Sequence, residues 1–239
     1  MRIDKFLSEC GVATRKEAVK AGKAGLVTVN GKCVRDLSEH LNPESAVVTF
    51  LGKKVEYRRF TYVMLNKPEG YVSATDDKSL PFVTELLPPE LRKMELFPVG
   101  RLDKDTVGLM ILTNNGKLAH ALLSPKRHVK KIYRFLSAEP LIDGAEELFL
   151  NGVTLKDGYE CKSAVLKLNP ERTGGEITLT EGKYHQIKRM IASTGNRVTY
   201  LERIRFADIT LDEGLGRGEW RMLKKEEIAL LEEAGQKQI

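Results

Sequence analysis

Residues 100–116, GRLDKDTVGLMILTNNG, contain the feature that most constrains how this chain folds. The unbroken apolar run at 109–112 lies between a glycine and a polar turn, as is typical of a strand covered on both faces. The preceding residues carry both signs of charge, so we expect Asp103 to be partly desolvated and kept ionised by a nearby cation. An ordinary charged turn before a strand explains the same spacing equally well.

Length and composition limit the kind of protein. A chain of 239 residues is long enough for a small domain joined to a medium one, and 41% hydrophobic with 30% charged residues indicates a globular protein. No apolar run is long enough to cross a bilayer, and the first residues lack the apolar core of a signal peptide, so we expect a cytoplasmic protein without a membrane partner.

Cysteine and histidine usage argues against two further classes. The three cysteines are widely separated and odd in number, which does not suit a disulfide framework and fits a reducing compartment. Neither they nor the four histidines show metal-ligand spacing, so we expect no metal site.

Residues 1–50 predict a small α/β domain. Apolar residues at helical spacing end at Gly11, a capping box of Thr14 and Glu17 starts a second helix, and Asn30-Gly31 lies between alternating apolar residues as in a hairpin. Residues 1–60 carry twelve Lys and Arg against seven Asp and Glu, an excess that predicts a polyanion partner. A solvated charged face is the plainer explanation.

Residues 51–60 are rich in charge and lack periodicity, which predicts a linker. Beyond it, residues 61–239 alternate short strands with few helices, so we expect a bent mixed, mainly antiparallel sheet and an α+β fold overall. The expected strands are 61–65, 109–112, 133–136, 158–168, 175–180 and 198–201, and the expected helices are 116–123, 142–150, one from about 184 and 226–234.

Several segments resemble one known family. The Gly-Arg-Leu-Asp of residues 100–103, with the Thr, Gly, Asn and Gly residues after it, is similar to the catalytic motif of pseudouridine synthases of the small-subunit ribosomal RNA type. YVMLNKPEGYVSATDD at 62–77, KIYRF at 131–135 and EGKYHQIKRM at 181–190 resemble other motifs of that family. MRIDKFLSECGVATRKEA and VTVNGKCV resemble the S4 RNA-binding domain.

The resemblance implies roles for particular residues. Asp103 is expected to be the catalytic carboxylate, Tyr133 to stack on a flipped uracil, and Lys188 to pair with Asp103. It also implies two sets of binding residues. Substrate contacts are expected from Lys67, Arg101, Leu102, Gln186, Ile187 and Arg189, and RNA contacts in the first domain from Arg15, Lys16, Lys20 and Lys23.

The implied reaction breaks the glycosidic bond of a uridine, turns the base and rejoins it through C5. It needs no metal or other cofactor, and Asp103 acts in it as a nucleophile or as a base. The implied partner is small-subunit ribosomal RNA or a partly assembled small subunit, bound by a monomer. The alternatives are a synthase for large-subunit RNA, an assembly protein that only binds RNA, and metal-dependent phosphodiester cleavage at acidic pairs such as Asp103 with Asp105.

Overall fold

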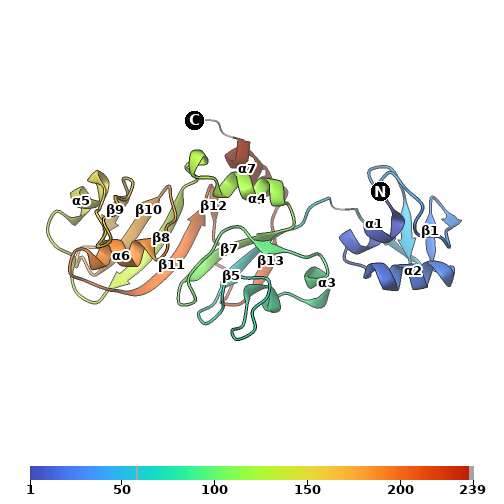
Figure 1. Cartoon of the computed structure of the whole chain (residues 1–239), viewed down its shortest axis with the longest axis horizontal. Helices are drawn as coiled ribbons and strands as arrows, with labels where there is room; N and C mark the ends of the chain where they lie inside the picture. The colour runs from blue at the N-terminus through green and yellow to red at the C-terminus, as the bar shows by residue number, and fades with distance from the viewer. Residues whose placement is uncertain (58, 237–239) are drawn as a thin grey trace. The chain divides into compact units, whose positions relative to one another are not determined.

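The structure is a computed structural model that describes residues 1–57 and 59–236, and the chain divides into two compact units (Figure 1). One unit takes the described residues of Met1–Thr61 together with Thr84–Phe97, and the other takes those of Tyr62–Val83 and Pro98–Ile239. Arg58 of the predicted linker and residues 237–239 of the predicted second domain lie outside the described part.

The first unit begins with two helices, α1 (Ile3–Glu9) and α2 (Arg15–Lys23), as the sequence predicts. The predicted capping box is present, since the Thr14 side chain accepts the Glu17 N–H and the Glu17 carboxylate accepts the Thr14 N–H. A four-stranded antiparallel sheet follows, in the order β2-β1-β3-β4. Its strands are β1 (Val27–Val29), β2 (Lys32–Cys33), β3 (Val48–Phe50) and β4 (Lys53–Val55).

The prediction of a linker from residue 51 is wrong for its first half. Strands β3 and β4 pair as a hairpin, Val55 is buried in the core of this unit, and the Tyr57 ring stacks on Phe6 with centroids 5.3 Å apart. Lys53 and Lys54 are exposed, so β4 sends only one side chain into the core and leaves no periodic signal in the sequence.

The second unit is built on a nine-stranded sheet in the order β13-β5-β7-β11-β8-β10-β9, with β12 paired to β11 and β6 to β7. From β13 to β9, and between β11 and β12, the pairings are antiparallel except that of β7 with β11, which is parallel; this confirms the predicted mixed, mainly antiparallel sheet. Its strands are β5 (Tyr62–Lys67), β6 (Phe97–Pro98), β7 (Val107–Thr113), β8 (Lys131–Ser137), β9 (Val165–Leu168), β10 (Gly174–Leu179), β11 (Val198–Phe206), β12 (Ile209–Thr210) and β13 (Trp220–Met222).

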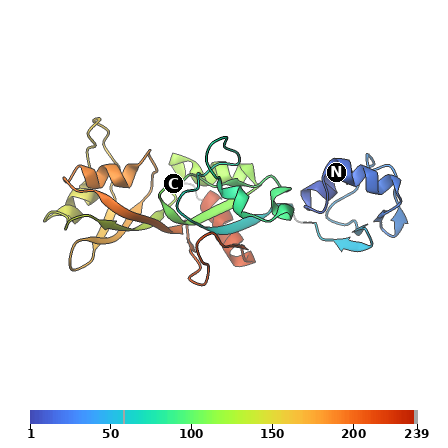
Figure 2. The same cartoon turned by 90° about the horizontal axis from the view of Figure 1, so that it is seen from below.

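Short helices accompany the sheet. Helix α6 lies on one face of the half formed by β8, β10 and β11 (Figure 2), and α4 packs against α7. The helices of this unit are α4 (Gly116–Leu123), α5 (Ala145–Asn151), α6 (Gln186–Ala192) and α7 (Lys225–Gln236), with the 3-10 turn η2 (Pro125–Arg127). Helix α3 (Pro89–Arg92) belongs to the first unit, and the 3-10 turn η1 (Val83–Leu86) lies at the division between the units.

The predicted strand over 158–168 is only half correct, because β9 begins at Val165. The side chains and backbone before it are held by Glu181, which accepts hydrogen bonds from the Tyr159 hydroxyl at 2.8 Å and the Lys162 N–H at 2.9 Å. The same segment also forms an isolated antiparallel bridge between Thr154 and Glu160, so it is not a continuous strand with β9.

The parallel junction of β7 with β11 joins the two halves of the sheet through two register pairs, Val107 with Glu202 and Gly108 with Arg203. Gly108 has a φ of +98°, and a Cβ at this position would overlap the Arg203 carbonyl oxygen. Only glycine therefore allows this approach. The same cross-strand row contains Lys67 on β5 and Tyr133 on β8, which places two predicted site residues on either side of the junction.

We predict that Gly108→Ala lowers the free energy of unfolding by about 2 kcal/mol or more, because the added methyl forces β7 away from β11 and strains the left-handed backbone. Gly182→Ala is the matched control, since its φ is not in that region and nothing lies within 4 Å of the added Cβ. Urea unfolding of both variants measures the effect. Equal stability of the two variants would contradict the account of the junction.

Candidate active site

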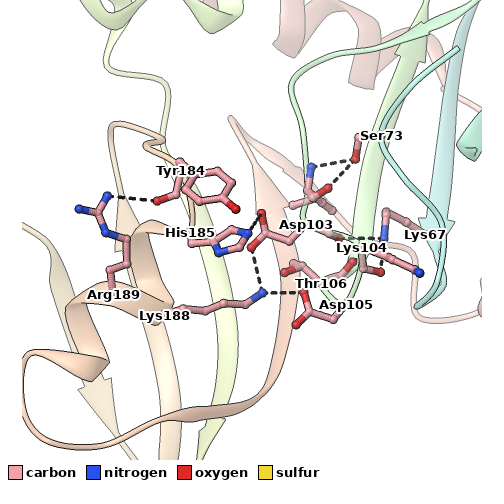
Figure 3. A network of polar contacts seen from close by, with 11 residues as sticks. Lys67, Ser73, Asp103, Lys104, Asp105, Thr106, Tyr184, His185, Lys188 and Arg189 are labelled. Atoms are coloured by element: carbon pink, nitrogen blue, oxygen red, sulfur yellow. Dashed lines mark hydrogen bonds and ion pairs between the residues drawn. The ribbon is translucent and has the colours of Figure 1, made fainter. Parts of the chain in front are cut away.

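The loop that carries Asp103 lies between β6 and β7 and is fixed through its backbone. Ser73 Oγ donates to the Leu102 carbonyl at 2.8 Å and accepts the Leu102 N–H at 2.9 Å (Figure 3). The Thr106 N–H donates to the Asp103 carbonyl at 3.1 Å and closes a turn. The Asp103 side chain is 26% exposed, so its carboxylate is reachable yet partly desolvated.

Lys67 holds the same loop from inside. It is fully buried, and its Nζ lies 2.8–3.2 Å from the backbone carbonyl oxygens of Pro68, Asp103, Lys104 and Thr106. Burial lowers the pKa of Lys67 to about 8, against the opposing effect of the Asp105 and Asp103 carboxylates. In the structure, the Lys67 ammonium that was predicted to contact substrate instead binds these four carbonyl oxygens.

Lys188 of α6 joins the two carboxylates of the loop. Its Nζ lies 3.0 Å from Asp103 Oδ2 and 2.5 Å from Asp105 Oδ1, so the predicted contact with Asp103 is present (Figure 3). Partial burial acts to lower the pKa of Lys188, but the two carboxylates outweigh it and the pKa is raised. Partial burial likewise acts to raise the pKa of Asp105, and the Lys188 ammonium reverses this and lowers it.

His185 is a further neighbour of Asp103 that the sequence did not single out for the site. Its Nε2 lies 3.5 Å from Asp103 Oδ1, so the two carboxylate oxygens face different cations or donors. His185 has a φ of +48° and caps the N-terminus of α6, which is why the helix begins at Gln186 rather than at Tyr184 as predicted. The Tyr184 ring stacks on the imidazole with centroids 3.8 Å apart. A left-handed histidine leaves no signal in a sequence pattern.

Two predicted substrate contacts on α6 bind other residues of the protein in this structure. Gln186 is buried, donates from Nε2 to Glu181 Oε1 at 2.6 Å and accepts the Lys183 N–H at 2.9 Å, so its amide holds the turn. Arg189 forms an ion pair with Asp157 and donates to the Tyr184 carbonyl at 3.4 Å. Its role is therefore to order the residues around Tyr184.

The other predicted contacts differ in exposure. Arg101 is exposed in the loop that carries Asp103. The next residue in that loop, Leu102, is buried, and so is Ile187 on α6. Tyr133 is 9% exposed and lies directly across from Arg203 in the row that contains Gly108. Tyr133 lies on β8, which is separated from β7 by β11 alone.

A buried arginine on β11 and a partly buried lysine on β8 lie near one aromatic ring. Arg203 donates from Nε to the Leu109 carbonyl at 2.8 Å and places its guanidinium carbon 5.2 Å from the centroid of the Phe206 ring. Lys131 Nζ lies 5.9 Å from the same centroid, and burial, reinforced by Arg203, lowers the pKa of Lys131 to about 8. Cation–π contacts offset part of the cost of burying these charges.

In the first unit, the four predicted RNA-binding residues are all exposed on α2. At 3.6 residues per turn they fall within an arc of about 140°, and the buried residues Ala18, Ala21 and Gly22 occupy the opposite side. The helix therefore presents one cationic face, made of Arg15, Lys16, Lys20 and Lys23.

Two further findings concern metals and membranes. Within residues 1–57 and 59–236, no three His, Cys, Asp or Glu side chains gather in a way that suits a metal ion. In the same part of the chain, no helix has the length and apolar character needed to span a membrane.

We predict that Lys67→Met lowers the free energy of unfolding by about 2–4 kcal/mol, because it removes the donor shared by four backbone carbonyl oxygens. Since the pKa of Lys67 is lower in the folded than in the unfolded chain, the unfolded chain binds its proton more tightly. The stability of the parent relative to Lys67→Met should therefore rise between about pH 8 and 10.5 and stay constant below pH 8. Urea unfolding across this range tests it, and a difference that falls with pH would contradict it.

Comparison with known proteins gives a consistent result. Residues 61–193 match the family described as RNA pseudouridylate synthase, and residues 1–47 match the S4 domain. The chain is 44% identical over 241 residues to an uncharacterized RNA pseudouridine synthase, YtzG, of Bacillus subtilis, covering 98% of this chain and 99% of that protein. It is 39% identical over 231 residues to ribosomal small subunit pseudouridine synthase A of Escherichia coli, covering 96% and 99%.

A solved structure agrees with these sequence relatives. A crystal structure of a pseudouridylate synthase superposes with a TM-score of 0.69 at 35% identity and covers 97% of this chain and 99% of its own. With the motif that carries Asp103 inside the matched region, the chain belongs to the RNA pseudouridylate synthase family and carries an S4 domain at residues 1–47.

Proposed function

We propose that this RNA pseudouridine synthase isomerises one uridine of small-subunit ribosomal RNA to pseudouridine, with Asp103 as the catalytic residue. The observation that carries the proposal is the setting of Asp103, a partly exposed carboxylate between Lys188 and His185 on a loop fixed by buried Lys67. The relatives named as small-subunit synthases in Escherichia coli and Vibrio vulnificus, 39% and 40% identical, support the choice of RNA.

The reaction requires that the bond between ribose C1′ and uracil N1 breaks, with its electron pair leaving on the base. The base then turns, C5 bonds to C1′, the proton on C5 is lost and N1 gains one. Asp103 serves either as the nucleophile at C1′ or as the base in a proton transfer, and both roles need the ionised carboxylate. The Lys188 ammonium lies 3.0 Å from Oδ2 and pairs with this carboxylate.

Other side chains complete the proposed site. A uridine within folded RNA is reached by flipping it out of the stack, which costs a few kcal/mol. Tyr133 stacks on the flipped uracil, Leu102 and Ile187 form apolar walls, and exposed Arg101 fills the space the base leaves. Arg189 orders the rim through Tyr184 and Asp157.

Affinity for the RNA comes from the cationic face of α2. Arg15, Lys16, Lys20 and Lys23 hold backbone phosphates, which offsets the cost of flipping and makes binding strongly salt-dependent. The S4 match over residues 1–47 supports this assignment.

We infer further that the protein acts as a monomer in the cytoplasm, on free small-subunit RNA or a partly assembled small subunit. Its three cysteines are widely separated and odd in number, in keeping with a reducing compartment.

Pseudouridine mapping of both ribosomal RNAs, from cells lacking the protein and from cells rescued with the parent or with Asp103→Asn, tests the proposal. We expect one small-subunit site to be lost and then restored only by the parent. In vitro, Asp103→Asn should reduce kcat by at least about 1,000-fold while RNA affinity stays within about twofold. An unchanged map, or full rescue by Asp103→Asn, would refute the proposal.

Substitution of Lys188 should affect the reaction more than substitution of Asp105, the second carboxylate that Lys188 contacts. Lys188→Met removes the cation beside Asp103 and should lower kcat by about 100- to 1,000-fold. Asp105→Asn, at a side chain 60% exposed, should lower it by less than about tenfold. Single-turnover rates at saturating enzyme measure both effects. A loss of rate in Asp105→Asn that exceeds the loss in Asp103→Asn would show that Asp105 is the catalytic carboxylate.

A further inference from the structure

Tyr184 exposes more of its surface than any other large hydrophobic residue in the described part of the chain. Its relative exposure is 77%, against 56% or less for the others. Single exposed hydrophobic residues are ordinary on protein surfaces. Tyr184 differs from them in its fixed orientation and in what lies next to it.

The ring is held in place before any ligand binds. It stacks on His185 with an interplanar angle of 17°, and the left-handed backbone of His185 at the start of α6 fixes the imidazole in turn. The Tyr184 carbonyl accepts a hydrogen bond from Arg189, whose guanidinium is itself paired with Asp157. An aromatic face that is already ordered loses little entropy on binding.

The ring is also close to the reacting centre. Figure 3 shows Tyr184, His185 and Asp103 in succession, with the ring centroids 3.8 Å apart and His185 Nε2 3.5 Å from Asp103 Oδ1. Neighbouring Lys183 is exposed and places its Nζ 4.9 Å from the centroid of the Tyr159 ring. An exposed aromatic ring among cations is the usual platform for an unpaired RNA base.

We infer that Tyr184 stacks on the base of a nucleotide adjacent to the target uridine, an inference that rests on the proposed action on ribosomal RNA. Flipping the uridine uncovers the face of a neighbouring base, and stacked bases in one strand are about 3.4 Å apart. The Tyr184 ring replaces the lost stacking partner and offsets part of the flipping cost. Tyr184 is a substrate-binding residue and takes no part in bond making.

Variants of Tyr184 separate stacking from other effects. On small-subunit RNA that the parent modifies, Tyr184→Ala should raise KM by about 5- to 100-fold, and Tyr184→Phe should stay within about twofold of the parent. In both variants, kcat at saturating RNA should remain within about threefold. Leu150→Ala on α5, a residue 53% exposed, is the control for loss of an exposed apolar side chain and should leave KM unchanged.

A spectroscopic measurement identifies the contact directly. A short RNA that contains the target uridine carries 2-aminopurine at the position before it or at the position after it, and fluorescence is recorded with Asp103→Asn protein to prevent turnover. We expect one position to be quenched on binding, with the quenching lost when Tyr184→Ala is added and retained with Tyr184→Phe. Quenching that is the same in all three proteins, or an unchanged KM in Tyr184→Ala, would overturn the inference.

The RNA that the parent protein modifies shows whether a failure concerns the proposed function or the stacking by Tyr184. If the parent leaves small-subunit RNA unmodified and modifies another RNA, the proposed substrate is wrong. The Tyr184 variants are then compared on the RNA that is modified, where a raised KM for alanine alone still supports stacking.

Discussion

The active-site geometry depends first on a buried ammonium group. Lys67 Nζ gathers the carbonyl oxygens of Asp103, Lys104 and Thr106, so the loop before β7 is folded around a charge that contacts no solvent. Burying an ammonium group is costly, and burial lowers the pKa of Lys67 to about 8 although the Asp105 and Asp103 carboxylates act against it. The carbonyl oxygens compensate for it, and in doing so they fix the direction in which the Asp103 side chain leaves the backbone.

A second constraint is that two carboxylates share one cation. The Lys188 ammonium lies 3.0 Å from Asp103 Oδ2 and 2.5 Å from Asp105 Oδ1. Asp105 is the more exposed of the two carboxylates, at 60% against 26% for Asp103, so water screens its contact with Lys188 more strongly. Asp103 therefore has the less solvated contact with Lys188, and a carboxylate that acts as a nucleophile or a base in this reaction acts in its ionised form.

The sequence predicted what depends on local pattern and missed what depends on a single backbone conformation. The buried strand β7, the capped helix α2 and the hairpin at Asn30-Gly31 follow from periodicity and turn chemistry, and the contact of Lys188 with Asp103 follows from the family motif. Strand β4 was missed because one buried valine leaves no alternation to read. The buried position of Lys67 was missed because its partners are carbonyl oxygens, which every residue carries, and His185 because nothing in a motif indicates a positive φ.

The structure distinguishes residues that support the site from residues that are exposed in it. Lys67 and Gln186, conspicuous in the sequence, use their polar groups to hold two turns, one on each side of Asp103. The loop before β7 is tied by Lys67, and the turn before α6 is tied by Gln186 and Glu181. The groups proposed to face RNA include two that the turns present, the Asp103 carboxylate on one side and the His185–Tyr184 stack on the other. The site is rigid because Lys67 and Gln186 hold the two turns in place. Its specificity then resides in the side chains that extend from these turns, and those can be substituted without disturbing the turns.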